Sequence, residues 1–246
     1  MRAYGMTDIG KKRSVNQDNI FFSTTPVGNL PNLFVVADGM GGHKAGDYAS
    51  RYATDVVIES IMNNTDTHVV SIITKAVNDA NNKVHIKAGT QEEYNGMGTT
   101  LVIATIVDNK LITANVGDSR LYLIEDGKIR QVTEDHSLVA EMVRMGQIDE
   151  KEARERPDKN IITRAIGVSE YIQADFFTNE LENNDYVLLC SDGLTNMLED
   201  GEILSIVDSD IDIEKKASDL IDSANLKGGK DNIAVIIIEP LFSEVQ

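Results

Sequence analysis

The chain runs Leu33-Phe34-Val35-Val36-Ala37-Asp38-Gly39-Met40-Gly41-Gly42 where an apolar stretch meets a glycine-rich turn. An apolar run of this length, closed by turn residues, predicts a buried β-strand. The aspartate after it would be held at a rigid place, and the glycine that follows would let the backbone carbonyl face the same cation as the carboxylate. A metal-binding turn competes here with a helix N-cap and with a glycine-rich connection that binds nothing.

Three other aspartates stand next to apolar runs: Asp118 after residues 111–116, Asp192 after residues 187–190, and Asp231 before residues 233–238. Taken one at a time, they have ordinary explanations as a hairpin turn, a helix cap and a simple turn. Together with Asp38 they would place carboxylates at the ends of core strands. If those ends converge, the sequence predicts an all-oxygen site suited to Mg²⁺ or Mn²⁺.

The segment between the first two expected strands contains Arg13 and Asp18. The planar guanidinium of arginine suits bidentate binding of phosphate oxygens. An aspartate nearby could hold water that is bound to a metal. The competing interpretation is a surface ion pair that contributes little.

The composition of the 246 residues limits the kinds of protein this can be. Their number is enough for one large domain or two small ones, and a hydrophobic content of 41% is enough for a core. The formal net charge of −17 would repel nucleic acid and anionic membranes, although it also fits a general role of acidic residues in solubility. No apolar run is long enough for a membrane helix, and the N-terminus lacks a signal-peptide core. We therefore expect a cytoplasmic protein with no membrane anchor and no nucleic-acid partner.

The single cysteine, Cys190, lies inside an apolar run, which predicts a buried structural thiol. One cysteine excludes an internal disulfide and fits a reducing compartment. The residue six positions later is Asn196 rather than arginine. The loop of phosphatases that use a cysteine nucleophile is therefore absent.

The order of the expected elements favours an α+β fold over a doubly wound sheet. Two helices and a strand-rich block, interpreted as a β-meander, follow the first strands, and acidic helices precede the last strand. Residues 149–157 are dense in charge and are expected to form a mobile, solvated excursion. No long linker divides the chain, so we expect residues 1–246 to form a single domain. The expected helices are 47–62, 69–86 and 136–145, the meander strands are 99–107, 110–116, 120–124 and 129–132, and the other strands are 3–9, 20–23, 33–37, 172–177, 186–190 and 233–239.

The combined motifs resemble those of the metal-dependent protein serine/threonine phosphatases of the PP2C, or PPM, family, and of its compact bacterial members in particular. The resemblance covers nearly the whole chain and rests on an ordered set of short motifs, each weak alone and highly specific together. They are Arg13 with Asn16-Gln17-Asp18, Asp38-Gly39-Met40-Gly41-Gly42-His43, Gly98-Thr99-Thr100, Gly117-Asp118-Ser119-Arg120, Asp135-His136-Ser137, Thr163-Arg164-Ala165-Ile166-Gly167, Ser191-Asp192-Gly193-Leu194 and Asp231-Asn232.

The resemblance implies a central β-sandwich of two antiparallel sheets flanked by helix pairs, in four αββα layers. It also implies a pair of Mn²⁺ or Mg²⁺ ions bridged by Asp38. The Gly39 carbonyl would bind one ion, and Asp192 and Asp231 would complete the shell of the other. In bacterial relatives a third ion lies between the positions that match Asp118 and Asp192.

By the same resemblance, Arg13 binds the substrate phosphate and Asp18 holds waters bound to the metals. The implied reaction is hydrolysis of phosphoserine and phosphothreonine in proteins by direct attack of water activated by the two ions. The implied partners are a cognate Ser/Thr kinase and its phosphorylated substrates, and we expect a monomer. Residues 145–162 match the variable flap beside the active site of the family.

One position departs from some eukaryotic relatives, in which a histidine proposed as general acid follows the Asp-Gly pair. This chain has Met40 there, so the group that protonates the leaving alkoxide stays open, as do the roles of His43 and His136. Two other functions also stay open. The chain could be a non-catalytic relative that binds phosphoproteins or metal, or a hydrolase of small phosphate esters.

Overall fold

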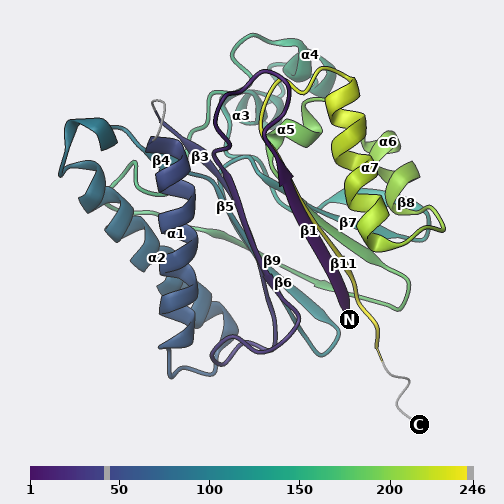
Figure 1. Ribbon diagram of the computed structural model, residues 1–246, viewed down its shortest axis with the longest axis horizontal. Helices are drawn as coiled ribbons and strands as arrows, with labels where there is room; N and C mark the ends of the chain where they lie inside the picture. Colours follow the sequence, from purple (N-terminus) through teal and green to yellow (C-terminus); the bar gives the residue numbers. More distant parts are fainter. Residues whose placement is uncertain (42–44, 243–246) are drawn as a thin grey trace.

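The computed structural model describes residues 1–41 and 45–242 as two antiparallel β-sheets packed face to face, with helices on both outer sides (Figure 1). The strands are β1 Arg2–Asp8, β2 Asp18–Ser23, β3 Leu33–Met40, β4 Gly98–Thr99, β5 Leu101–Val107, β6 Lys110–Val116, β7 Arg120–Glu125, β8 Lys128–Gln131, β9 Asp175–Glu180, β10 Tyr186–Cys190 and β11 Ile233–Glu239. One sheet has the order β1-β11-β10-β7-β8, and the other has the order β2-β3-β5-β6-β9 with β4 paired to β3. The expected α+β class and its β-sandwich are confirmed.

The helices form the two outer layers of the sandwich. The first pair, α1 Ala45–Met62 and α2 Val69–Ala88, packs on the sheet that contains β3, and the second pair, α6 Asp200–Val207 and α7 Ile213–Leu226, packs on the sheet that contains β11 (Figure 1). The shorter helices are η1 Glu92–Tyr94, α3 Leu138–Arg144, α4 Glu150–Glu155 and α5 Asp192–Thr195. None of the helices within these described ranges has the length and apolar character needed to cross a membrane.

Central strands are apolar without interruption because both of their faces are buried. In β3, Leu33, Val35 and Ala37 pack against the α1–α2 pair. Phe34 and Val36 point the other way, into the core between the two sheets. Successive side chains of a strand alternate between its faces, so a strand between two cores must be apolar on both.

The expected β-meander is wrong at its centre. The pairs β5–β6 and β7–β8 form as expected. However, the other neighbour of β6 is β9 and the other neighbour of β7 is β10, so the chain crosses from one sheet to the other between Val116 and Arg120. A short glycine-aspartate turn fits a hairpin and a crossing equally well, and local periodicity does not say which sheet a strand joins.

Among the segments whose boundaries differ from the expected ones, two bear on the interpretation of the sequence. Strand β9 begins at Asp175 rather than at residue 172. The charge-dense segment contains helix α4, in which no residue is buried, and the Asp149 side chain caps it by accepting the backbone N–H of Glu152 at 2.7 Å. The charge density of this segment led to the expectation of a mobile excursion. An aspartate such as Asp149 before a run of helix-forming residues is, however, a typical N-cap and indicates a helix.

Candidate metal centre

Strand pairing brings Asp18 and Asp38 together. Asp18 is the first residue of β2 and Asp38 lies near the end of β3, within the strand rather than after it, and the two are direct partners in the antiparallel register. Side chains of such partners stand about 5 Å apart on the same face. The β2–β3 pair therefore places two carboxylates at one end of the sandwich.

The other sheet contributes Asp192 and Asp231 at the same end. Strand β10 ends two residues before Asp192, β11 begins two residues after Asp231, and the two strands are antiparallel neighbours. A Cβ on Gly193 would lie 1.8 Å from the carbonyl oxygen of Asn232. Only glycine after Asp192 allows the start of α5 to approach the turn that contains Asp231 this closely.

Asp118 lies in the crossing between the sheets, where hydrogen bonds of its neighbour connect it to the end of β3. The backbone N–H of Asp38 donates to Thr100 Oγ1 at 2.9 Å, and Thr100 Oγ1 lies 2.7 Å from the buried Ser119 Oγ. The Thr100 hydroxyl therefore connects the end of β3 to the residue that follows Asp118. The motif Gly98-Thr99-Thr100 stood out in the sequence, but the sequence did not indicate a role for Thr100.

Ser191 connects the two sheets beneath the carboxylates. Its Oγ donates to Asp18 Oδ2 at 2.6 Å and accepts the backbone N–H of Ala234 in β11 at 2.9 Å. Ser191 is fully buried, and Asp18 is 6% exposed. This hydroxyl fixes one oxygen of Asp18 and leaves the other free.

Burial and mutual repulsion perturb these carboxyl groups. Burial raises the pKa of Asp18 to about 7 and that of Asp192 to about 6, and neighbouring carboxylates add to both shifts. Burial raises the pKa of Asp38 well above its ordinary value, with further rises from Asp18, Asp192 and Asp118. The pKa of Asp118 is also raised, by burial and then by Asp192. Negative charges held this close without enough cations favour protonation or a metal.

The oxygen atoms of the cluster fit a divalent cation. Asp18 Oδ1 and Asp192 Oδ1 are buried and have no hydrogen-bond partner. Buried oxygens are almost always paired, so two unpaired carboxylate oxygens within one cluster of interacting aspartates point to a hard cation as the missing partner. Across residues 1–41 and 45–242, no three acidic, histidine or cysteine side chains already surround a single point closely enough to bind an ion. Small side-chain rotations would therefore accompany binding.

Arg13 reaches the cluster from the loop between β1 and β2. Its Nη2 donates to Asp231 Oδ2 at 2.7 Å, while its side chain remains 49% exposed. The hydrogen bond to Asp231 is the main cause that raises the pKa of Arg13, and Asp38 and Asp192 add to it. The guanidinium is thus oriented toward the carboxylates with part of its surface open to solvent.

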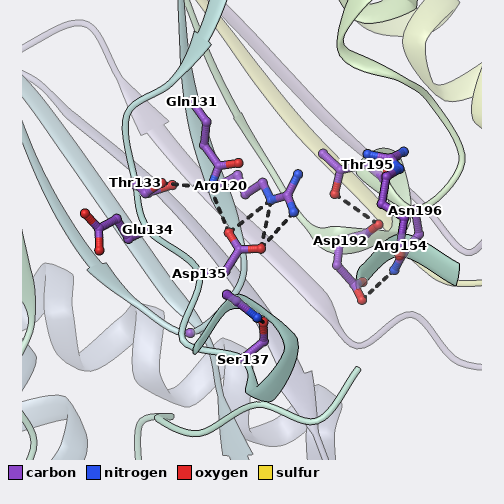
Figure 2. A network of polar contacts seen from close by, with 12 residues as sticks. Arg120, Gln131, Thr133, Glu134, Asp135, Ser137, Arg154, Asp192, Thr195 and Asn196 are labelled. Atoms are coloured by element: carbon purple, nitrogen blue, oxygen red, sulfur yellow. Dashed lines mark hydrogen bonds and ion pairs between the residues drawn. The ribbon is translucent and has the colours of Figure 1, made fainter. Parts of the chain in front are cut away.

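A pocket of about 450 Å³ opens beside Asp118 and Asp192, between helices α3 and α4 and the α5–α6 segment. One of its walls contains a network in which Arg120 makes a three-bond contact with Asp135 (Figure 2). Gln131 also donates to Asp135, at 2.8 Å. The carboxylate of Asp135 is thus held by Arg120 and Gln131, whereas Asp192 Oδ1 has no hydrogen-bond partner.

His136, whose role the sequence left open, is a buried structural connection. Its Nδ1 accepts the backbone N–H of Gly117 at 3.0 Å, so the ring proton lies on Nε2, which donates to Asp175 Oδ2 at 3.0 Å. Burial lowers the pKa of His136. The histidine thus supports the residue before Asp118 without facing the carboxylates.

The predicted site residues Arg13, Asp18, Asp38, Gly39, Asp118, Asp192 and Asp231 lie at one end of the sandwich. Asp18, Asp38, Asp192 and Asp231 influence one another electrostatically, and Asp118 joins them through Asp38 and Asp192. Gly42 and His43 lie outside the described residues. Cys190 is a buried free thiol, as expected, and burial raises its pKa to about 12.

Comparison with known proteins identifies the group to which this fold and this set of residues belong. The family model described as "Protein phosphatase 2C" matches residues 4–233. The chain belongs to the protein phosphatase 2C family. The family and enzyme class expected from the motifs are confirmed, and metal dependence is typical of this family.

Individual PP2C relatives match over nearly their full lengths. Protein phosphatase PhpP of Streptococcus pneumoniae is 44% identical over 236 residues, which covers 95% of each chain. The solved S. agalactiae serine/threonine phosphatase has a TM-score of 0.89 and 37% identity, and the match covers 96% of this chain and 98% of that one. The catalytic domain of PstP, solved in complex with two manganese ions, has a TM-score of 0.85 and 29% identity, with 97% of both chains covered.

Proposed function

We propose that this PP2C chain hydrolyses phosphoserine and phosphothreonine in proteins and that Mn²⁺ or Mg²⁺ is its cofactor. Asp38, the Gly39 carbonyl, Asp192 and Asp231 would hold two ions, and Asp118 with Asp192 would hold a third. The observation that carries the proposal is the convergence of these carboxylates from both sheets, with unpaired buried oxygens on Asp18 and Asp192. The two manganese ions in the related PstP domain support the choice of metal.

The chain supplies two further groups that the reaction needs, one to bind the phosphate and one to orient the attacking water. Bound divalent cations would make water acidic enough to attack at neutral pH and would offset charge on the phosphoryl oxygens. The partly exposed guanidinium of Arg13 can bind two phosphate oxygens and orient the phosphorus. Asp18 Oδ1 is free to accept a hydrogen bond from the attacking water. Cys190 is buried with a raised pKa, so the chain offers no thiolate for a covalent route.

We also propose the setting in which the enzyme acts. Residues 1–246 would form one phosphatase domain that is monomeric and cytoplasmic, and it would oppose a cognate Ser/Thr kinase. The near-complete coverage of relatives named as serine/threonine phosphatases supports the single domain. The single cysteine fits a reducing compartment.

Phosphate release from a phosphothreonine peptide tests this function directly. We expect turnover in Mn²⁺ that is lost in EDTA and restored by added metal. Phosphopeptide binding without turnover would favour the non-catalytic module. Turnover restricted to small phosphate metabolites would favour a hydrolase of small phosphate esters.

Replacing Arg13 with alanine should weaken substrate binding more than metal binding. Charge-assisted hydrogen bonds contribute about 1.5–3 kcal/mol, so we expect the KM for p-nitrophenyl phosphate to rise at least about tenfold. Mn²⁺ affinity, measured by isothermal titration calorimetry, should be retained or slightly improved because Asp231 loses a competing cation. Loss of Mn²⁺ binding in this variant would contradict the assigned role.

We propose that residues 145–162 form the flap that selects protein substrates. Arg154 of α4 attaches this segment to the core by donating to the carbonyls of Thr195 and Leu198, at 3.0 and 3.3 Å. Replacing residues 145–162 with a short Gly/Ser linker should reduce turnover of phosphoproteins several-fold more than turnover of p-nitrophenyl phosphate. Equal loss on both substrates would argue against a selectivity role.

A further inference from the structure

Asn232 is a buried residue next to the candidate ligand Asp231, and its side chain uses both of its donors and its acceptor. Its Oδ1 accepts the backbone N–H of Gln17 at 2.9 Å. Its Nδ2 donates to the carbonyl of Ile9 at 2.9 Å and to the carbonyl of Val15 at 3.0 Å. Asn232 is 3% exposed, so water does not replace these bonds. One side chain therefore joins the two ends of the loop formed by residues 9–17.

The loop that Asn232 closes is the one that contains Arg13. Its first half also packs directly on the turn of Asp231. The backbone N–H of Lys11 donates to the carbonyl of Gly229 at 2.8 Å. Gly10 has φ +76°, and a Cβ there would lie 2.2 Å from the carbonyl oxygen of Asp231. Near the tip of the loop, Arg13 contacts the core through Asp231.

We propose that Asn232 is a positioning residue that sets the place of Arg13 over the phosphate site. This inference rests on the proposed function. It explains why an asparagine follows Asp231, since only an amide offers two donors and an acceptor at this size. Aspartate would set an oxygen against the carbonyls of Ile9 and Val15, and leucine would remove the partner of three backbone groups.

The first test measures the loop itself and does not depend on activity. Lys11, Lys12 and Arg13 provide trypsin cleavage sites in the loop. In the full-length protein, Asn232→Ala should raise the rate of cleavage at these sites about tenfold or more, as identified by mass spectrometry. Asn232→Ser, which keeps one hydroxyl, provides a milder variant should the alanine form fail to fold.

Asn32 offers a matched control at the opposite end of β3. It is 4% exposed, and its side chain exchanges two hydrogen bonds with the backbone of Ile106, each 2.7 Å long. Asn32→Ala should lower the melting temperature as Asn232→Ala does. It should leave both the cleavage of the loop and the KM unchanged, which separates positioning from general loss of stability.

The second test is a double-mutant cycle with Arg13→Ala. We expect Asn232→Ala to raise the KM for p-nitrophenyl phosphate several-fold in the wild-type background, with Mn²⁺ affinity by calorimetry within about threefold. In the Arg13→Ala background, Asn232→Ala should raise the KM little further, because the guanidinium that Asn232 positions is already absent.

Two results would overturn the positioning role. One is wild-type loop cleavage in both Asn232 variants, and the other is a KM effect that multiplies in full with that of Arg13→Ala. A wild-type protein without phosphatase activity would instead contradict the proposed function. The trypsin comparison would still decide whether Asn232 holds the loop.

Discussion

Replacing Asp38 with asparagine is expected to abolish turnover and, at the same time, to stabilise the protein when metal is removed. Replacing a residue that only supports a metal ligand lowers metal affinity or activity by about 10–100-fold. Loss of the proposed bridging ligand itself should therefore lower kcat/KM by about 10³-fold or more. Burial and the neighbouring carboxylates raise the pKa of Asp38, and in EDTA this cost of holding the charge disappears in the asparagine variant. A gain of about 1 kcal/mol corresponds to about 2–4 °C in the melting temperature of a chain of this size.

The control for this experiment is Asp185→Asn. Asp185 is also a buried aspartate whose pKa is raised by burial, but it lies in the turn before β10 and accepts the backbone N–H of Glu182. Its replacement should leave turnover and Mn²⁺ binding within about twofold of the wild type. Asp38→Asn with more than a tenth of wild-type activity would contradict the role given to Asp38.

Stability without metal is expected to fall as the pH rises from about 4 to about 7. The pKa of Asp18 is raised to about 7 and that of Asp192 to about 6, from an ordinary value of 3.8. In this range the folded chain therefore binds more protons than the unfolded chain, and stability decreases with pH. The loss should reach a few kcal/mol, or several degrees of melting temperature in EDTA. His136, whose pKa is lowered, acts in the opposite direction and reduces the net change.

Metal should reverse this dependence, because Mn²⁺ binds the ionised carboxylates and its binding releases protons. At a free Mn²⁺ concentration of about 100 times the Kd, the stabilisation is about 2.7 kcal/mol. The increase in melting temperature caused by Mn²⁺ should therefore be larger at pH 7.5 than at pH 5. Asp18→Asn should flatten the profile in EDTA. A melting temperature in EDTA that rises steadily from pH 5 to 7.5 would contradict this account of the cluster.

Much of the fold could be predicted because its strongest signals are local. Continuous apolar runs such as residues 33–37 and 233–238 are long enough to show strands buried on both faces, and both are central strands here. The pairing of strands is a long-range property that the same signals do not contain. The meander failed for that reason at Asp118, where a turn that looks like a hairpin joins two different sheets.

The residues of the candidate site were predicted from the sequence, but the hydrogen bonds that hold them in place were not. Arg13 and the aspartates stand in recognisable motifs. Ser191, Thr100 and Asn232 act instead through side-chain hydrogen bonds between segments far apart in the chain. Nothing in the local sequence reveals the partner of a buried hydroxyl or amide. Ser191 and Asn232 were marked only by standing next to Asp192 and Asp231, and Thr100 only by the motif Gly98-Thr99-Thr100.

A crystal structure of the protein with Mn²⁺, with anomalous difference maps, tests the central claim most directly. We predict two strong peaks, with Asp38 bridging them, the Gly39 carbonyl on one ion, and Asp192 and Asp231 on the other. A weaker third peak is expected between Asp118 and Asp192. Peaks that do not contact Asp38, or no peaks among these carboxylates at saturating Mn²⁺, would contradict the assignment.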